Sequence, residues 1–160
     1  LGIVLPLFTD EVYSAERGQG AYYNGTRISV SDRDFKNGIV RTSFSSYDRS
    51  LSPICFETAR KIFPQVNDLR RYGACSVELC KLAKGEEDRF FELTLNPWFL
   101  KRQVVVLQAE TGIHWITERR PLLLLQTKKK TGKNFLRLSL LSLMNINIRG
   151  DSFCARMSKL

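Results

Sequence analysis

The stretch Arg71-Tyr-Gly-Ala-Cys-Ser-Val-Glu-Leu-Cys-Lys-Leu-Ala-Lys-Gly85 carries the clearest structural signal of this chain, because it contains a glycine turn, a helix and a helix stop in succession. From Ser76 to Lys84 the apolar residues fall on one helical face, and Gly85 stands where a glycine commonly ends a helix. The aromatic segment Arg89 to Leu93 follows and is typical of a short strand. The stretch therefore predicts a helix that leads directly into a strand.

Upstream of this helix, the sequence predicts two successive β-hairpins. Gly2 to Phe8 is rich in strand-forming residues, and Glu11 to Glu16 alternates in polarity after a short connection. Asn24-Gly25 then separates two further strand candidates, Ala21 to Tyr23 and Arg27 to Val30. Asn-Gly favours a tight hairpin turn because both residues tolerate a positive φ.

Between the hairpins and the central stretch, a strand and a helix are expected. Ile39 to Phe44 is a strand candidate. Ser52 and Pro53 predict the N-cap and first turn of a helix, and Pro64 predicts its end. The apolar face of this helix would contain Cys55, Ala59 and Ile62.

The charge of the chain changes sharply near residue 100. The composition is that of a globular protein, with 43% hydrophobic and 26% charged residues and a net charge of +9. Residues 1–100 hold 13 basic and 13 acidic residues, whereas residues 101–160 hold 12 and 3. Neither a helical nor a strand period persists in the second segment. It is therefore expected to be a divergent basic tail, poorly ordered from about residue 113 onward.

Several protein classes are disfavoured by the remaining sequence features. Leu1 to Phe8 lacks the basic start of a signal peptide, and Phe135 to Ile148 is too short and polar to span a membrane. No Cys-x-x-Cys occurs, and His114 has no partner at a metal-ligand spacing, so zinc is not expected. A reduced, cytoplasmic location is the default for the four cysteines, Cys55, Cys75, Cys80 and Cys154.

Three short segments could carry chemistry, and each has a simpler structural alternative. The glycine of Tyr72 to Ser76 could expose N–H groups to an anion or a sugar hydroxyl, or it could only close a turn. The glutamate of Phe90 to Leu93 could bind a polyol, or it could be a solvated residue at a strand end. Asn96-Pro97-Trp98 could form a rigid functional turn, or a structural turn with a packed indole.

Taken together and in order, these segments resemble the inositol monophosphatase family. The resemblance begins with the hairpin segment Gly2 to Gly25 and its Asp-Glu, Gly-x-Gly-Ala and Asn-Gly elements. It continues without a gap through Arg71 to Gly85, Asp88 to Leu93 and Asn96 to Trp98. It covers roughly residues 1–99, and several motifs at the right spacing are more specific than any one of them.

The resemblance implies a fold, a reaction and a set of substrate contacts. The implied fold is an α/β layered sandwich of the sugar-phosphatase type, and the implied reaction is Mg²⁺-dependent, lithium-sensitive hydrolysis of a phosphate monoester such as myo-inositol monophosphate. By the same resemblance, Glu92 accepts hydrogen bonds from the inositol hydroxyls, and the helix start at Gly73, Ala74 and Cys75 meets the inositol. Ala74 replaces the usual Ser or Thr hydroxyl. A serine at Ser45 or Ser46 is a further expected contact.

The sequence also departs from the family pattern where metal ligands are expected. The first metal glutamate and the Asp-Pro-Ile-Asp-Gly-Thr motif lie upstream of the hairpin in the family, so the N-terminal half of the fold is expected to be absent. Phe99 occupies the position of the aspartate that follows the tryptophan. With suitable codons for Leu100 to Val104, a reading frame shifted by one base would encode Glu-Ala-Ala-Gly, which is the family's sequence at this point. Residues 1–99 are therefore interpreted as a partial family domain, and residues 100–160 as a divergent tail that is frame-shifted or disordered.

The resulting functional hypothesis is a phosphatase fragment that is inactive by itself. It would bind inositol or a sugar monophosphate but no Mg²⁺, and whether it is an enzyme in its own right stays open. One alternative is a nucleic-acid or anionic-surface binder that uses Lys128 to Lys130, Lys133 and Arg137, although no aromatic platform accompanies these charges. Another is a non-catalytic remnant that forms a homodimer.

Overall fold

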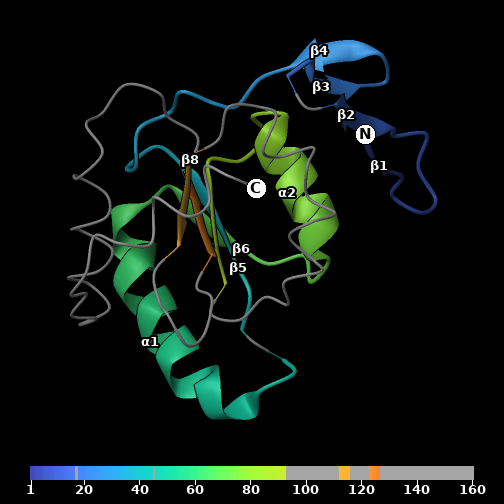
Figure 1. Cartoon of the computed structure of the whole chain (residues 1–160). Helices are drawn as coiled ribbons and strands as arrows, with labels where there is room; N and C mark the ends of the chain where they lie inside the picture. The colour runs from blue at the N-terminus through green and yellow to red at the C-terminus, as the bar shows by residue number, and fades with distance from the viewer. Residues whose placement is uncertain (17, 45, 93–111, 116–122, 127–160) are drawn as a thin grey trace.

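The computed structural model describes residues 1–16, 18–44, 46–92, 112–115 and 123–126, the last two ranges by their backbone (Figure 1). The elements in chain order are β1 (Gly2–Val4), β2 (Tyr13–Glu16), β3 (Gly20–Tyr23), β4 (Thr26–Ile28), β5 (Ile39–Thr42), the 3₁₀ helix η1 (Arg49–Leu51), α1 (Ser52–Ile62), the 3₁₀ helix η2 (Phe63–Gln65), β6 (Asp68–Arg70), α2 (Cys75–Ala83), β7 (Arg89–Glu92), β8 (Gly112–Trp115) and β9 (Leu123–Gln126).

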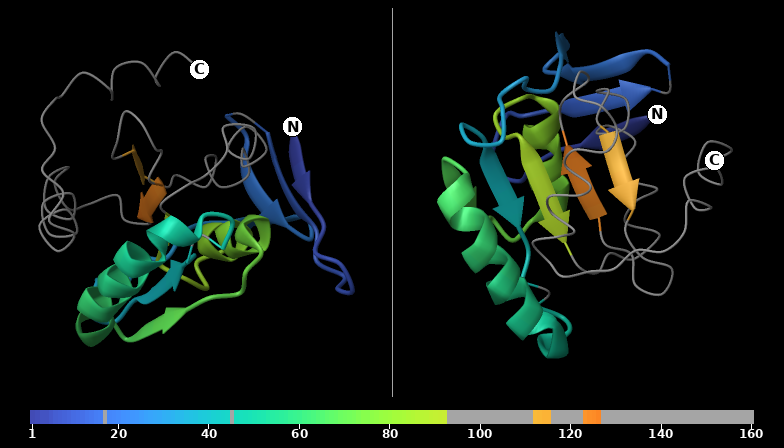
Figure 2. Two further views of the ribbon diagram at one scale, coloured as in Figure 1. Left: turned by 90° about the horizontal axis from the view of Figure 1, so that it is seen from below. Right: turned by 90° about the vertical axis from the view of Figure 1, so that its left-hand side faces the viewer.

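The described elements form alternating layers of helix and sheet. Strands β1 to β4 make one sheet, and the other five strands make a second sheet in the order β6-β5-β7-β9-β8. Helix α2 lies between the two sheets, and α1 lies on the far side of the second sheet (Figures 1 and 2). This arrangement confirms the predicted α/β layered class.

The first sheet contains the two predicted hairpins. Its strands run antiparallel in sequence order, with Val4 opposite Tyr13 at the first connection. At the second connection, Asn24 has a φ of 46° and Gly25 a φ of 79°. These values are the left-handed conformations that an Asn-Gly turn supplies, so the second hairpin prediction is confirmed. The first hairpin is also present, but β1 ends at Val4 and β2 begins at Tyr13, so residues 5–12 form a longer connection than the short one that was predicted.

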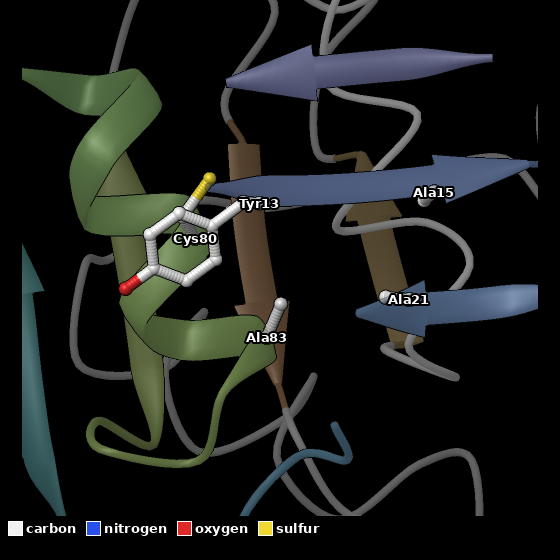
Figure 3. Close-up of a cluster of buried hydrophobic side chains, with 5 residues drawn as sticks. All are labelled: Tyr13, Ala15, Ala21, Cys80 and Ala83. Atoms are coloured by element: carbon white, nitrogen blue, oxygen red, sulfur yellow. The ribbon is translucent and has the colours of Figure 1, made fainter. Parts of the chain in front are cut away.

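A small core joins this sheet to α2. Tyr13, Ala15 and Ala21 point from the sheet toward Cys80 and Ala83 of the helix (Figure 3). Four of the five side chains are small, which allows the helix to approach the sheet closely, and the Tyr13 ring is fully buried among them. The alternation predicted for β2 is therefore confirmed, because Tyr13 and Ala15 face the helix.

The second sheet combines parallel and antiparallel strands. β5 pairs in parallel with β6 and with β7, whereas β9 pairs antiparallel with β7 and with β8. The sequence pattern predicts β5 and β7 but not the other three strands. β6 has only three residues, two of them charged. β9 pairs with the distant strand β7, and β8 pairs only with β9, so neither depends on a local pattern that periodicity could detect.

Strands β8 and β9 lie in the segment where the sequence predicted a loss of regular structure. β9 pairs along the whole of β7, with Leu123 opposite Glu92, so this part of the predicted tail contributes to the sheet. The rest of residues 100–160 lies outside the described residues. The domain boundary at residue 99 therefore stays a prediction.

Helix α1 shows the predicted face and end but a different beginning. Its buried residues include Cys55, Ala59 and Ile62, and it ends before Pro64. Ser52 is not the N-cap, because its backbone is already helical and η1 precedes it. Leu51 is the N-cap of α1 and makes no side-chain cap hydrogen bond. The side-chain cap lies upstream at Asp48, the N-cap of η1, whose carboxylate accepts a hydrogen bond of 3.1 Å from the Ser50 N–H. A 3₁₀ turn thus extends the helix by one turn at its N-terminal end.

Helix α2 ends at the predicted glycine. Gly85 has a φ of 78°, and its N–H donates to the Leu82 carbonyl over 3.0 Å. The Glu86 N–H donates to the Lys81 carbonyl over 3.1 Å. These two hydrogen bonds are the pair that caps the C-terminus of a helix when the next residue is left-handed. The helix itself begins at Cys75, one residue before the predicted start.

Replacing Gly85 with alanine should lower the free energy of unfolding by about 2 kcal/mol, because a Cβ adds a steric clash to the left-handed strain. The new atom would lie 3.0 Å from the Ser29 carbonyl oxygen and 3.0 Å from the Ser31 nitrogen. Gly18→Ala is the matched control, since Gly18 has the same φ of 78° and no atom within 4 Å of the added carbon. Urea unfolding measures both variants, and equal losses would contradict the clash.

Among the described residues, no helix is long and apolar enough to cross a membrane. The segment Phe135 to Ile148, which the sequence analysis considered and rejected as a span, lies outside those residues. The expected cytoplasmic location stays a prediction.

Candidate functional site

The carboxyl ends of three parallel strands meet at one edge of the second sheet. Register places Arg41 of β5 beside Arg70 of β6 and Phe90 of β7, so the residues that follow these strands come together. The Ser43 N–H donates to the Phe91 carbonyl over 3.3 Å and fixes the β5 and β7 ends side by side. Ligands of α/β proteins commonly bind at such an edge. The predicted polyol residue Glu92 ends β7 here.

Glu92 is a buried carboxylate, with 7% of its surface exposed. Burial raises the pKa of Glu92 above the ordinary glutamate value, and the negative charge of Glu78 acts in the same direction. A hydrogen bond from the Ser43 side chain and the charge of Arg71 oppose this rise in the pKa. Glu92 is therefore not a solvated strand-end residue, and it is an acceptor held among polar groups.

The turn before α2 is held by a carboxylate from within the helix. Glu78 Oε1 accepts a hydrogen bond of 2.5 Å from the Tyr72 N–H and one of 3.1 Å from the Gly73 N–H. Gly73 has a φ of 89°, in the left-handed region. The N–H of Gly73 is thus used inside the protein, which corrects the interpretation that this group is free for an anion. First-turn amides have no partner within a helix, so those of Cys75 and Ser76 are the donors that the helix start could offer to a ligand.

Cys75 lies at the helix start beside both carboxylates. Burial raises the pKa of the Cys75 thiol, and the charges of Glu92 and Glu78 raise it further. The side chain is therefore a neutral thiol near neutral pH. Gly73, Ala74 and Cys75 thus come together with Glu92, as the family resemblance implied. Their contact with a substrate stays a prediction.

An exposed arginine borders the site on the side of β6. Arg71 Nη2 donates to Ser46 Oγ over 2.9 Å, and the guanidinium carbon lies 5.9 Å from the centre of the Phe44 ring. Ser46 therefore approaches the site through Arg71, whereas Ser45 lies outside the described residues. Sequence reasoning did not single out Arg71, although it directly follows the β6 end.

A buried ion pair contacts the Tyr72–Gly73 turn through the Tyr72 ring. Arg41 of β5 pairs through Nη2 with Glu87 Oε1, and both side chains are almost fully buried. The Arg41 guanidinium carbon also lies 4.1 Å from the centre of the Tyr72 ring. Tyr72 is thus fixed by its backbone to Glu78 and by its ring to Arg41. Neither charged residue was predicted, because sequence patterns assign charged residues to the surface.

The sequence model of the inositol monophosphatase family matches residues 1–127 of this chain. The chain belongs to this family. The match extends beyond residue 99, where the recognisable motifs ended, and it includes strands β8 and β9.

Relatives from bacteria show how much of a family member the chain represents. It is 34% identical over 113 residues to the fructose-1,6-bisphosphatase/inositol-1-monophosphatase of Aquifex aeolicus, covering 70% of this chain and 42% of that protein. It is 32% identical over 111 residues to the Nus factor SuhB of Escherichia coli, covering 68% of this chain and 42% of that protein. The chain therefore spans less than half the length of these family members.

Solved structures of the family share the fold. The extragenic suppressor protein suhB of Bartonella henselae superposes with a TM-score of 0.69 at 23% identity, over 87% of this chain and 54% of that one. The inositol monophosphatase of Anabaena gives a TM-score of 0.66 at 23% identity, over 74% of this chain and 50% of that one. The layered architecture is thus that of an inositol monophosphatase in part.

The Mg²⁺ that the family resemblance implies does not fit the donors of this site. Mg²⁺ prefers several hard oxygen ligands in octahedral geometry. Across the parts of the chain that the structure describes, no group of three or more His, Cys, Asp or Glu residues could hold a metal ion. Glu92 and Glu78 are two carboxylates already engaged with Ser43 and the Tyr72–Gly73 backbone. Phe99 lies outside the described residues.

Proposed function

We propose that this chain carries the polyol-binding part of a phosphatase that hydrolyses inositol monophosphate or a related sugar phosphate monoester, and that it is inactive by itself. The observation that supports this most strongly is the buried carboxylate of Glu92 beside the start of α2, at the carboxyl edge of the parallel strands. A polar group this deeply buried costs free energy unless it has partners, and its position at this edge suits a ligand.

The charge of the site favours hydroxyl groups over a phosphate at this position. A carboxylate accepts hydrogen bonds from vicinal hydroxyls, and the first-turn amides of α2 donate hydrogen bonds to hydroxyl oxygens. Glu92 and Glu78 together would repel a phosphate placed between them. The neutral ring of an inositol or a sugar therefore suits this edge of the sheet better than a phosphate does. Ala74 supplies no hydroxyl, so the helix start contributes backbone donors only.

The other functional hypotheses rest on residues without a structural description. The lysines of the nucleic-acid alternative, Lys128 to Lys130, Lys133 and Arg137, lie outside the described residues. No residue of the chain was assigned to the homodimer alternative. Both stay predictions, and the polyol site is the function that the described geometry supports best.

Binding of myo-inositol to the 160-residue chain should be weak but specific, with amide signals of Gly73 to Ser76 shifting in an NMR titration. Glu92→Gln should weaken this binding about tenfold or more, because it replaces charge-assisted hydrogen bonds with neutral ones. Glu86→Gln is the control, since Glu86 pairs with Lys81 and Lys84 on the surface near the helix end. No titration by the wild-type chain, or equal binding by both variants, would contradict the proposal.

The pH dependence of this binding should follow the ionisation of Glu92. Because its pKa lies above the ordinary value of 4.5, the acid form persists to higher pH than in a solvated glutamate. Affinity for inositol should therefore rise with pH through the raised pKa of Glu92, as the accepting carboxylate forms.

The free energy of unfolding should change with pH in the opposite direction. Ionising a buried carboxyl group opposes folding, so Glu92→Gln should become more stable relative to the wild-type chain as pH rises. Titrations and urea unfolding from about pH 4 to pH 8 test both trends.

A further inference from the structure

We infer that Glu78 is a positioning residue of the polyol site: its carboxylate holds the Tyr72–Gly73 turn that sets the start of α2 beside Glu92, and its charge makes the site select neutral hydroxyls over anions. The inference rests on the proposed function for the identity of the ligand. The hydrogen bonds that carry it are independent of any ligand.

Glu78 replaces a missing cap at the start of α2. Ala74 is the N-cap of the helix, and no side-chain hydrogen bond caps that end. Ser, Thr, Asp or Asn normally fills this role. Helical side chains point back toward the N-terminus, so a glutamate one turn into α2 can reach over the first turn. There Glu78 accepts from the two amides that precede Ala74.

The turn would lose its conformation without this acceptor. Gly73 sits in the left-handed region, which a free loop leaves readily. Glu78 is 1% exposed, so water cannot replace its carboxylate as the partner of the Tyr72 and Gly73 amides. Buried amides without partners are costly. Removing the acceptor should therefore release the turn, and with it the backbone of Ala74 and Cys75 at the site.

The second part of the inference follows from charge. Glu78 acts on both Glu92 and Cys75, and in each case it raises the pKa of the neighbouring group. The charged groups that oppose it are Arg71 at the rim, which lowers the pKa of Glu92, and Arg41, which pairs with Glu87. Glu78 therefore adds a second negative charge beside Glu92, from its place at the Tyr72–Gly73 turn.

Two substitutions separate geometry from charge. Glu78→Gln keeps an oxygen that accepts from both amides but removes the charge, whereas Glu78→Ala removes both. Glu86→Gln is the matched control, because it removes a glutamate charge near the other end of α2. Each variant of the full chain is compared by amide hydrogen exchange at Tyr72 and Gly73, alkylation of Cys75 against pH, and NMR titration with myo-inositol and with inorganic phosphate.

In Glu78→Ala, exchange at the Tyr72 and Gly73 amides should accelerate at least tenfold, and inositol binding should fall about tenfold. In Glu78→Gln, exchange and inositol binding should stay within about threefold of wild type. Alkylation of Cys75 should begin at lower pH in this variant, and phosphate binding should increase. These fold-changes correspond to loss of the acceptor of two amide hydrogen bonds in Glu78→Ala and to its replacement by a neutral acceptor in Glu78→Gln. Thermal unfolding of all variants accounts for any global loss of stability.

Unchanged exchange in Glu78→Ala would overturn the positioning role, and an unchanged Cys75 profile in Glu78→Gln would overturn the role of its charge. If the wild-type chain binds no inositol, the proposed function fails. The exchange and alkylation measurements still decide the role of Glu78 in that case, because neither uses a ligand. Loss of protection in Glu78→Gln equal to that in Glu78→Ala would also contradict the separation of geometry from charge.

Discussion

Replacing Glu87 with alanine should lower the free energy of unfolding by about 3–5 kcal/mol, because it leaves the Arg41 guanidinium buried without its ion-pair partner. The side chains of Arg41 and Glu87 are 4% and 3% exposed, so solvent screens the pair little. Among the described residues, Arg41 Nε and Glu87 Oε2 have no hydrogen-bond partner. Apart from its contact with the Tyr72 ring, the Arg41 guanidinium therefore has little to replace the lost ion pair. Urea unfolding at neutral pH measures the loss.

The control for this prediction is an ion pair on the surface. Glu57 pairs with Arg60 over 2.9 Å on the exposed face of α1, where solvent screens the charges, so Glu57→Ala should destabilise the protein far less than Glu87→Ala. The double substitution Arg41→Met with Glu87→Leu should recover much of the loss, since buried pairs are often replaceable by apolar residues. A loss below about 1 kcal/mol in Glu87→Ala would show that Arg41 finds another partner.

The elements that the sequence predicted correctly are those with strong local signals. The Asn24-Gly25 turn and the Gly85 stop require a left-handed backbone, and few residues other than these provide it. The apolar face of α1 follows the helical period closely enough to identify Cys55, Ala59 and Ile62, which are all buried. These features depend on neighbours within about one turn of chain.

The features that the sequence missed depend on distant partners. β6 is a strand because Leu69 pairs with Val40 of β5, although all of α1 separates these two residues in the sequence. β9 is a strand because it pairs along β7. The sequence predicted Ser52 as the N-cap of α1. In the structure, Asp48 accepts a hydrogen bond from the Ser50 N–H and begins a 3₁₀ turn that leads into α1. No local pattern distinguishes these outcomes.

The site was predicted only through the family resemblance, and only in part. Glu92 and the Gly73–Cys75 helix start were named from motifs, and the parallel strand order explains why they meet. Glu78 was missed because a single glutamate within an apolar helix face is normally interpreted as a solvated residue. One signal could have found it, since an alanine at the N-cap leaves the helix start without a side-chain acceptor.

The 160-residue chain should release no phosphate from inositol monophosphate in the presence of Mg²⁺, and Phe99→Asp should not restore activity. The reaction needs carboxylates that hold the metal ions, and one added aspartate is a poor Mg²⁺ site. Enzymes accelerate such reactions by many orders of magnitude. The expected difference in the rate of phosphate release between this chain and an intact family member is therefore the largest effect predicted. A phosphate-release assay beside such an intact member measures it.

Two further carboxylates of the described region, those of Asp88 and Glu11, are engaged in structural hydrogen bonds. Asp88 is fully buried and accepts from the Ile39 N–H and from Arg33 Nε, over 2.6 and 2.9 Å. Glu11 accepts hydrogen bonds from the hydroxyls of Tyr13 and Tyr23. Activity should therefore appear only when the upstream half of a family relative is supplied together with the aspartate at position 99. Lithium-sensitive turnover by the unmodified chain, lost in Glu92→Ala, would contradict this, because it would require these engaged carboxylates to form a working metal site.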